Sequence, residues 1–166
     1  MKHANPQQLR LLAIAPSSRG FGFVVMEGED SLVNWGVKEA KGDKNIKSLA
    51  KVEALIAQYQ PDMLVLHDMT DARRAARIKE LNQDLLALAA TRKLKVKLIS
   101  DQQVKRVFFA DGEGTKHTRA EIIAARFPDQ LSFLLPPKRR TWESEDGRMC
   151  MFDAVALALV YRHQKK

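Results

Sequence analysis

Apolar residues follow two different periods along the chain, and together they predict an α/β protein. Short apolar runs or alternations, the pattern of strands, occupy five segments: residues 11–15, 21–25, 33–37, 63–66 and 96–99. Apolar residues three or four positions apart, the pattern of helices, occupy three longer segments: residues 46–59, 75–88 and 148–163. Three strands followed by alternating helices and strands form a mixed α/β domain, an order that several folds share.

Two shorter helices are expected between the last strand and the C-terminal helix. Asp101 is expected to cap the first of them. Thr118 and Glu121 have the spacing of a capping box for the second, which Pro128 should end. Residues 131–146 show no period, so an irregular segment is expected before the last helix.

A strand, a tight turn and a second strand at residues 11–25 organise the N-terminal part of the chain. The frame at residues 14–24, IAPSSRGFGFV, resembles the I-D-P-G-S-R-x-x-G-(Y/F)-G opening of the RuvC-like Holliday-junction resolvases, which are nucleases of the RNase H-like superfamily. Three further segments resemble this family in register: YQPD at residues 59–62 before an apolar strand, QVK at 103–105 followed by Lys116, and FDAVALA at 152–158.

The resemblance spans residues 11–163 and implies an α/β fold of the RNase H-like type, a mixed five-stranded sheet flanked by helices. A single domain is expected at residues 11–166, preceded by a flexible N-terminal arm of residues 1–10. The first three strands should be antiparallel. Three of the family's site positions should lie together at one edge of the sheet, namely Ala15, His67 and Asp153.

The resemblance also implies a nuclease site in which four acidic positions hold two divalent ions. In this sequence those positions are Ala15, His67, Cys150 and Asp153, so three of the four lack a carboxylate. Asp68 is one residue from the second position and would point to the opposite face if the strand continues. Because Mg²⁺ needs several oxygen ligands, one carboxylate cannot hold two such ions, and we expect neither cleavage nor a cofactor.

The residue types are also compatible with other kinds of site. The candidate catalytic residues are Asp153, His67 and Asp68. A zinc ion would suit His67, Cys150 and Asp153. An active nuclease with a rearranged Mg²⁺ or Mn²⁺ site would instead combine Asp153 with other acids: Asp68, Glu143, Glu145 and Asp146. The structural alternatives are a buried, apolar Cys150, a satisfied structural His67, and an Asp153 that hydrogen-bonds backbone or Ser17.

Basic side chains match the family better than the acids do. The net charge of +8 favours a polyanionic partner, nucleic acid before a membrane. Lys105 and Lys116 occupy positions where the resemblance implies contacts with junction DNA. The further candidates for nucleic-acid binding are Arg106, Arg119, Arg73, Arg74, Arg77, Lys138, Arg139 and Arg140. On a shared face these residues would neutralise phosphates, and otherwise they are solvated surface residues.

The expected function is binding of branched or structured nucleic acid, DNA rather than RNA, without cleavage; a scaffold subunit of a larger complex is the remaining alternative. The Ala/Leu stripe at residues 71–92 fits either a homodimer or packing on the sheet. The resemblance implies an aromatic side chain just after the second acidic position, which acts as a wedge in a DNA junction. The residues near that place are Met69 and Thr70, so opening of a junction by such a wedge is not expected. One cysteine and no apolar stretch of signal-peptide or membrane-span length predict a cytoplasmic protein without a membrane partner.

Overall fold

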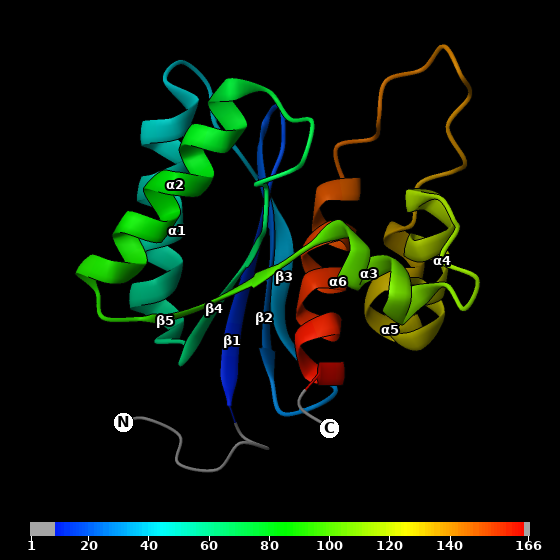
Figure 1. Cartoon of the computed structure of the whole chain (residues 1–166), viewed down its shortest axis with the longest axis horizontal. Coiled ribbons are helices and arrows are strands. Elements are labelled where there is room, and N and C mark those ends of the chain that lie inside the picture. The colour runs from blue at the N-terminus through cyan, green and yellow to red at the C-terminus, as the bar shows by residue number, and fades with distance from the viewer. Residues whose placement is uncertain (1–8, 165–166) are drawn as a thin grey trace.

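The computed structural model describes residues 9–164, and a mixed five-stranded sheet forms their centre (Figure 1). The strands are β1 (Arg10–Pro16), β2 (Gly20–Glu27), β3 (Ser31–Glu39), β4 (Met63–His67) and β5 (Lys95–Ile99). Their order across the sheet is β3-β2-β1-β4-β5. β1, β2 and β3 pair antiparallel, whereas β4 pairs parallel with both β1 and β5. The predicted fold class and the antiparallel first three strands are confirmed.

Helices cover both faces of the sheet (Figure 1). On one face lie α1 (Lys44–Tyr59) and α2 (Ala76–Thr91). On the other lies α6 (Met149–Gln164), and beyond it lie α3 (Asp101–Phe108), α4 (Lys116–Arg126), α5 (Pro128–Leu131) and the short 3₁₀ helix η2 (Ser132–Leu134). The sheet therefore separates two apolar cores, one beneath α1 and α2 and one around α6.

Strand β1 supplies side chains to both cores in strict alternation. Leu12 and Ile14 belong to the core beneath α1 and α2, whereas Leu11, Ala13 and Ala15 belong to the core around α6. Alternation follows from the two-residue period of a strand, and burial on both faces explains why this segment of the sequence is apolar throughout. Ala15 consequently faces the helix that carries Asp153.

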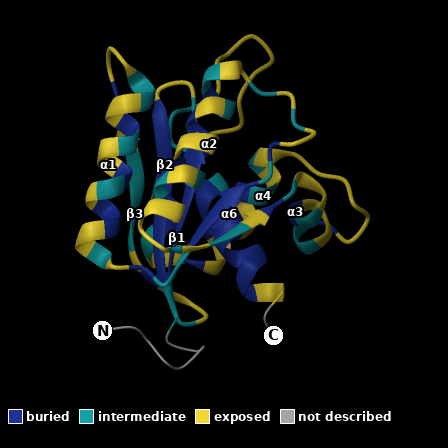
Figure 2. Ribbon diagram, turned by 60° about the vertical axis from the view of Figure 1, so that its left-hand side comes forward, coloured by how far each residue is buried: buried dark blue, intermediate teal, exposed yellow. Residues whose placement is uncertain are grey.

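Helix α6 lies between the sheet and the α3–α5 layer and is buried nearly all round, as its colour in Figure 2 shows. A helix buried on every side carries apolar residues on every face, so its sequence has no amphipathic stripe. Asp153 is the exception in the first turns of the helix, because it keeps partial exposure among buried neighbours. A half-buried carboxylate at such a position needs polar partners.

Both short helices are capped by residues that precede the expected caps. The N-cap of α3 is Ser100, not Asp101: its Oγ accepts from the N–H of Gln103, and the Gln103 side chain accepts from the N–H of Ser100. The N-cap of α4 is Thr115, whose Oγ1 accepts from the N–H of Thr118. The Asp101 carboxylate is thereby free for another partner, and Lys116 becomes the first residue of α4.

The second helix packs on its own sheet. α2 begins one residue later and ends three residues later than the predicted segment 75–88, and Arg73 and Arg74 precede it. Its stripe of Leu81, Leu85 and Ala89 is fully buried in the core beneath α1 and α2. This packing uses the apolar stripe within one chain, so the stripe gives no support to the homodimer expected through residues 71–92.

The chain ends bear on two remaining expectations. Residues 1–8 of the predicted N-terminal arm lie outside the described residues, and Arg10 already belongs to β1, where its N–H donates to the Asp62 carboxylate. Within residues 9–164, no helix combines the length and apolar character needed to cross a membrane.

Candidate functional site

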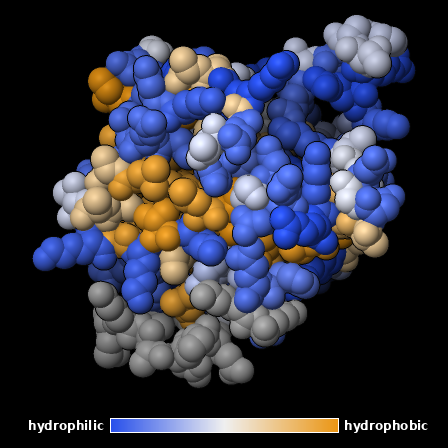
Figure 3. Space-filling view, viewed as in Figure 1, coloured by the Kyte–Doolittle hydropathy of each residue, from blue (hydrophilic) through white to orange (hydrophobic). Residues whose placement is uncertain are grey.

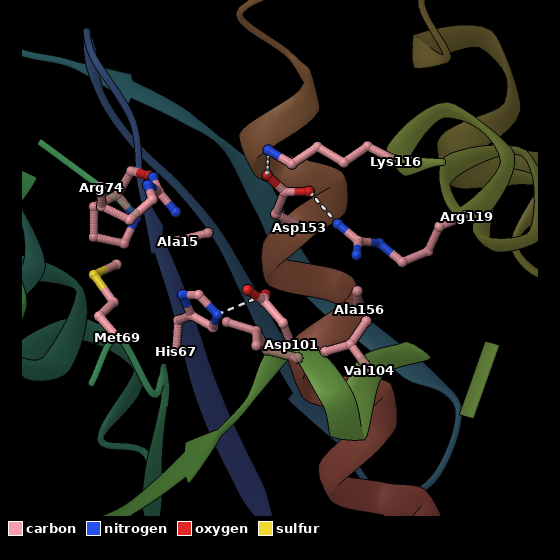
Figure 4. A pocket seen from close by; sticks show the side chains of 12 residues that line it. Ala15, His67, Met69, Arg74, Asp101, Val104, Lys116, Arg119, Asp153 and Ala156 are labelled. Carbon is pink, nitrogen blue, oxygen red and sulfur yellow. Dashed lines mark hydrogen bonds and ion pairs between the residues drawn. The ribbon is translucent and has the colours of Figure 1, made fainter. Parts of the chain in front are cut away.

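A small cavity lies where the carboxyl ends of the parallel strands β1 and β4 meet α3, α4 and α6 (Figure 4). Its volume is about 70 Å³. It is lined by Ala15, Pro16, His67, Met69, Arg74, Asp101, Val104, Lys116, Arg119, Asp153, Ala156 and Leu157. The prediction that Ala15, His67 and Asp153 lie together is therefore confirmed. The carboxyl ends of parallel strands are a common place for ligand sites in α/β proteins.

Asp153 points into the cavity and pairs with two cations from α4 (Figure 4). Nη2 of Arg119 donates to Oδ1 over 2.6 Å, and Nζ of Lys116 donates to Oδ2 over 3.3 Å. The side chains of Arg119 and Asp153 are only 15% and 21% exposed, so water screens this pair weakly. These two cations bind both oxygens of the Asp153 carboxylate. The structural alternative expected backbone or Ser17 as its partner instead.

Lys116 joins the cavity to the loop that precedes α6. Its Nζ also donates to Oε1 of Glu145 over 3.1 Å. Burial by itself would lower the pKa of Lys116, but the charges of Asp153 and Glu145 outweigh this effect, and the net result is a raised pKa. Lys116 is therefore a fixed positive charge at neutral pH.

His67 is held at the end of β4 by a partner that the sequence did not indicate. Its Nε2 lies 2.8 Å from Oδ1 of Asp101, the residue released from capping by Ser100. The backbone oxygen of His67 also accepts from Nδ2 of the buried Asn82 on α2. His67 thus matches the structural alternative, a satisfied histidine, and Asp101 is the site residue that sequence reasoning assigned to capping alone.

The donor set of the cavity does not fit a divalent metal ion. Ala15 has no side-chain oxygen, and Asp153 is already paired with two cations. Cys150 lies outside the lining, is buried, and its Sγ donates to the backbone oxygen of Gly147. Within residues 9–164, no three His, Cys, Asp or Glu side chains converge in a way that would hold a metal ion. Neither the zinc set nor a magnesium set is assembled.

The acids of the rearranged site each have another partner. Glu145 bonds Lys116, Asp146 bonds Arg148, and Oε1 of Glu143 accepts from the N–H of Arg140. Asp68 lies outside the cavity lining and accepts hydrogen bonds from the hydroxyl and N–H of Thr70, which lower its pKa. Four carboxylates are therefore distributed over separate ion pairs and turns instead of facing one point.

The two lysines matched to the family lie in different places. Lys116 lines the cavity with Arg119 and Arg74. Lys105 is exposed on α3 and lines a separate hollow with Gln102, Arg106 and Gly112. The predicted basic residues therefore form more than one group, and the structure brings Lys116, Arg119 and Arg74 together at the candidate site.

Two of the predicted DNA-binding arginines hold the turn between β1 and β2. Nη2 of Arg74 donates to the backbone oxygen of Pro16 over 3.0 Å, and Nη2 of Arg77 donates to that of Ser17 over 3.0 Å. These bonds fix the turn beside the cavity. Arg73 is exposed, as are Lys138, Arg139 and Arg140, which form the 138–140 cluster.

Cys150 is expected to be unreactive in the folded protein. Burial, together with the nearby charges of Asp153 and Glu145, raises the pKa of its thiol to about 11. Compared with a free cysteine of pKa ~8.5, roughly 300-fold less thiolate is present at neutral pH. Ellman's reagent should therefore modify Cys150 slowly in buffer and rapidly in urea, where the unfolded chain is the control. Equal rates in the two conditions would contradict the burial of this thiol.

Comparisons with known proteins agree with this architecture. Neither a protein-family model nor a curated protein matches the sequence. Among solved structures, RuvC of Thermus thermophilus matches with a TM-score of 0.69 and 16% identity over 95% of this chain and 96% of that one. The yeast mitochondrial Holliday junction resolvase Ydc2 matches with 0.62 and 14% over 93% and 78%, and the fowlpox virus Holliday junction resolvase with 0.58 and 13% over 94% and 99%. The chain therefore has the fold of the RuvC-like Holliday-junction resolvases.

Proposed function

We propose that this protein binds branched or structured DNA at the cavity between β1, β4, α4 and α6, and does not cleave it. The observation that carries the proposal is the double ion pair of Asp153 with Lys116 and Arg119. Similarity in fold to Thermus thermophilus RuvC, a protein also solved in complex with a Holliday junction substrate, supports DNA as the ligand.

The charges of the cavity favour a phosphate group. Arg74, Lys116 and Arg119 contribute three positive charges to the lining, against the two carboxylates Asp101 and Asp153. A DNA phosphate that approaches Lys116 or Arg119 can replace a carboxylate as hydrogen-bond acceptor without a new desolvation step for the cation. Fixed cations of this kind position a DNA backbone and carry no base information.

The same ion pairs argue against phosphodiester cleavage. Metal-dependent cleavage requires cations that polarise the phosphate and activate a water molecule. Lys116 and Arg119 supply positive charge, but a guanidinium or ammonium group with its donors bound to Asp153 does not lower the pKa of a water molecule as a bound metal does. DNA binding should consequently require no divalent ion.

The test is a pair of assays on a four-way DNA junction and a linear duplex of the same sequence. We expect retention of the junction in gel-shift experiments, affinity in EDTA at least equal to that in Mg²⁺ or Mn²⁺, and intact strands on denaturing gels. Asp153→Asn is the matched variant: it removes the carboxylate charge shared by Lys116 and Arg119, while Lys116 keeps Glu145. It should strengthen binding several-fold, since one negative charge is lost from the cavity.

Two results would contradict the proposal. Strand cleavage that requires Mg²⁺ or Mn²⁺ and disappears in Asp153→Asn would establish an active nuclease with a rearranged site. Absence of binding to any branched, single-stranded or duplex DNA would leave a scaffold subunit as the function.

A further inference from the structure

We infer that Trp142 is a stacking platform for an unpaired base of the bound nucleic acid. Trp142 lies in the long loop between η2 and α6, which rises from the body of the molecule above α4 and α6 (Figure 1). The residue is 75% exposed, an unusual state for the largest apolar side chain. This inference rests on the nucleic-acid binding proposed above and adds a contact with bases to it.

An ordered turn presents the indole ring to solvent. The N–H of Glu143 donates to the backbone oxygen of Arg140 over 3.0 Å, which closes a four-residue turn, and Oε1 of Glu143 accepts from the N–H of Arg140. Nη1 of Arg139 donates to the backbone oxygen of Glu143. Trp142 occupies the third position of this turn, so its backbone is held while its ring stays outside. Such preorganisation lowers the entropy cost of binding through the ring.

Three cations precede Trp142, and three acids follow it at positions 143, 145 and 146. Glu145 and Asp146 are paired with Lys116 and Arg148, so the cations on the N-terminal side favour a polyanion over an apolar protein partner. These cations are the 138–140 cluster, and the Arg140 guanidinium lies over the Trp142 ring at 5.5 Å from the centroid. Figure 3 shows a predominantly hydrophilic surface where the loop rises. An aromatic ring beside clustered cations combines base stacking with phosphate neutralisation, the combination found in proteins that bind single-stranded nucleic acid.

The loop is also anchored to the candidate site. Glu145, three residues after Trp142, bonds Lys116, which in turn bonds Asp153 in the cavity. Three consecutive Cα–Cα steps of 3.8 Å span at most ~11 Å. A stacked nucleic-acid strand advances ~3.4 Å per nucleotide, so about three nucleotides cover this Cα separation, and a few more cover the side chains at its two ends. One strand can therefore place a phosphate at Lys116 and a base on Trp142.

Binding measurements on three variants test the inference. Trp142→Ala should weaken binding of a single-stranded oligonucleotide and of a four-way junction by about fivefold or more, since stacking contributes ~1–3 kcal/mol per base. The reduction on a blunt, fully paired duplex should be smaller. Trp142→Phe should retain most of the affinity. Phe133→Ala is the matched control, because Phe133 is 71% exposed but lies in η2, outside the basic turn.

Two further measurements separate stacking from charge and from protein contacts. The slope of log affinity against log salt should be the same in Trp142→Ala as in the wild type, because the variant retains every cation that binds phosphate. The chain contains two tryptophans, Trp35 and Trp142, so Trp35→Phe leaves Trp142 as the single reporter. Its fluorescence should be quenched in a saturable manner by the oligonucleotide.

The outcomes distinguish this inference from the proposed function. Wild-type affinity in Trp142→Ala, with binding weakened in a Lys116 variant, would overturn the role of Trp142 and leave the DNA-binding proposal intact. Failure of the wild-type protein to bind any nucleic acid would overturn both. A self-associated species in light scattering that Trp142→Ala disperses would reassign the ring to a contact between copies of the chain.

Discussion

Replacing Lys105 and Lys116 together by glutamine is expected to weaken DNA binding by about one hundredfold near 0.1 M salt. Removing one cation that binds a phosphate lowers the slope of log affinity against log salt by ~0.9 unit on duplex DNA, which is roughly tenfold in affinity at that salt concentration. Glutamine is preferred to glutamate, because a carboxylate at position 116 would face Asp153 and Glu145. Binding is measured by fluorescence anisotropy of a labelled junction over a series of salt concentrations.

The single variants rank the two lysines. Lys116→Gln should have the larger effect, because Lys116 lines the cavity whereas Lys105 lines a separate hollow on α3. Lys51→Gln is the matched control, since Lys51 is exposed on α1, on the opposite face of the sheet. An unchanged affinity and salt slope in the folded double variant would mean that neither lysine binds DNA. Arg73 or the 138–140 cluster would then be the binding surface.

Gly22→Ala is expected to destabilise the protein by ~3 kcal/mol or more, at the upper end of the cost of overpacking a core. A Cβ atom at Gly22 would lie 2.2 Å from both the carbonyl carbon and the oxygen of Cys150 and 2.3 Å from the nitrogen of Met151. These are backbone atoms at the start of α6, so the helix itself would have to move. Urea unfolding followed by circular dichroism measures the change.

Gly147→Ala serves as the control for this prediction. The nearest atom to its added Cβ is Nη1 of Arg19 at 3.3 Å, the end of a flexible side chain that can shift. Its effect should stay within about 1 kcal/mol. Wild-type stability in Gly22→Ala would contradict the seating of α6 on β2, which is the contact that places Asp153 beside Ala15.

The close approach at Gly22 links the sequence motif to the site. Gly22 pairs with Ala15 in the register of β1 and β2, and α6 crosses it through Cys150. Because only a residue without a Cβ admits the helix backbone here, the glycine of the motif brings the α6 carboxylate to the strand end. Gly22, a residue of the sequence motif, therefore marks the place where α6 contacts the sheet.

The existence of the strands and long helices was predicted better from the sequence than the boundaries of the short helices. The five strands and three long helices follow from periodicity, because burial on one or two faces leaves a regular trace in residue type. The beginnings of α3 and α4 were misplaced by one and three residues, since Ser100, Asp101, Thr115 and Thr118 are all competent caps. Local chemistry offers several start points, and tertiary packing selects one.

For the candidate site, the family resemblance in the sequence predicted that Ala15, His67 and Asp153 lie at a common sheet edge. The sequence by itself also determined that three of the four matched positions lack a carboxylate. The partners of those residues were decided by the tertiary structure. Lys116 and Arg119 are 37 and 34 residues from Asp153, and Asp101 is 34 residues from His67. Such pairs depend on how α3 and α4 dock beside α6, a placement made by buried apolar contacts that leave no periodic trace at the charged positions themselves.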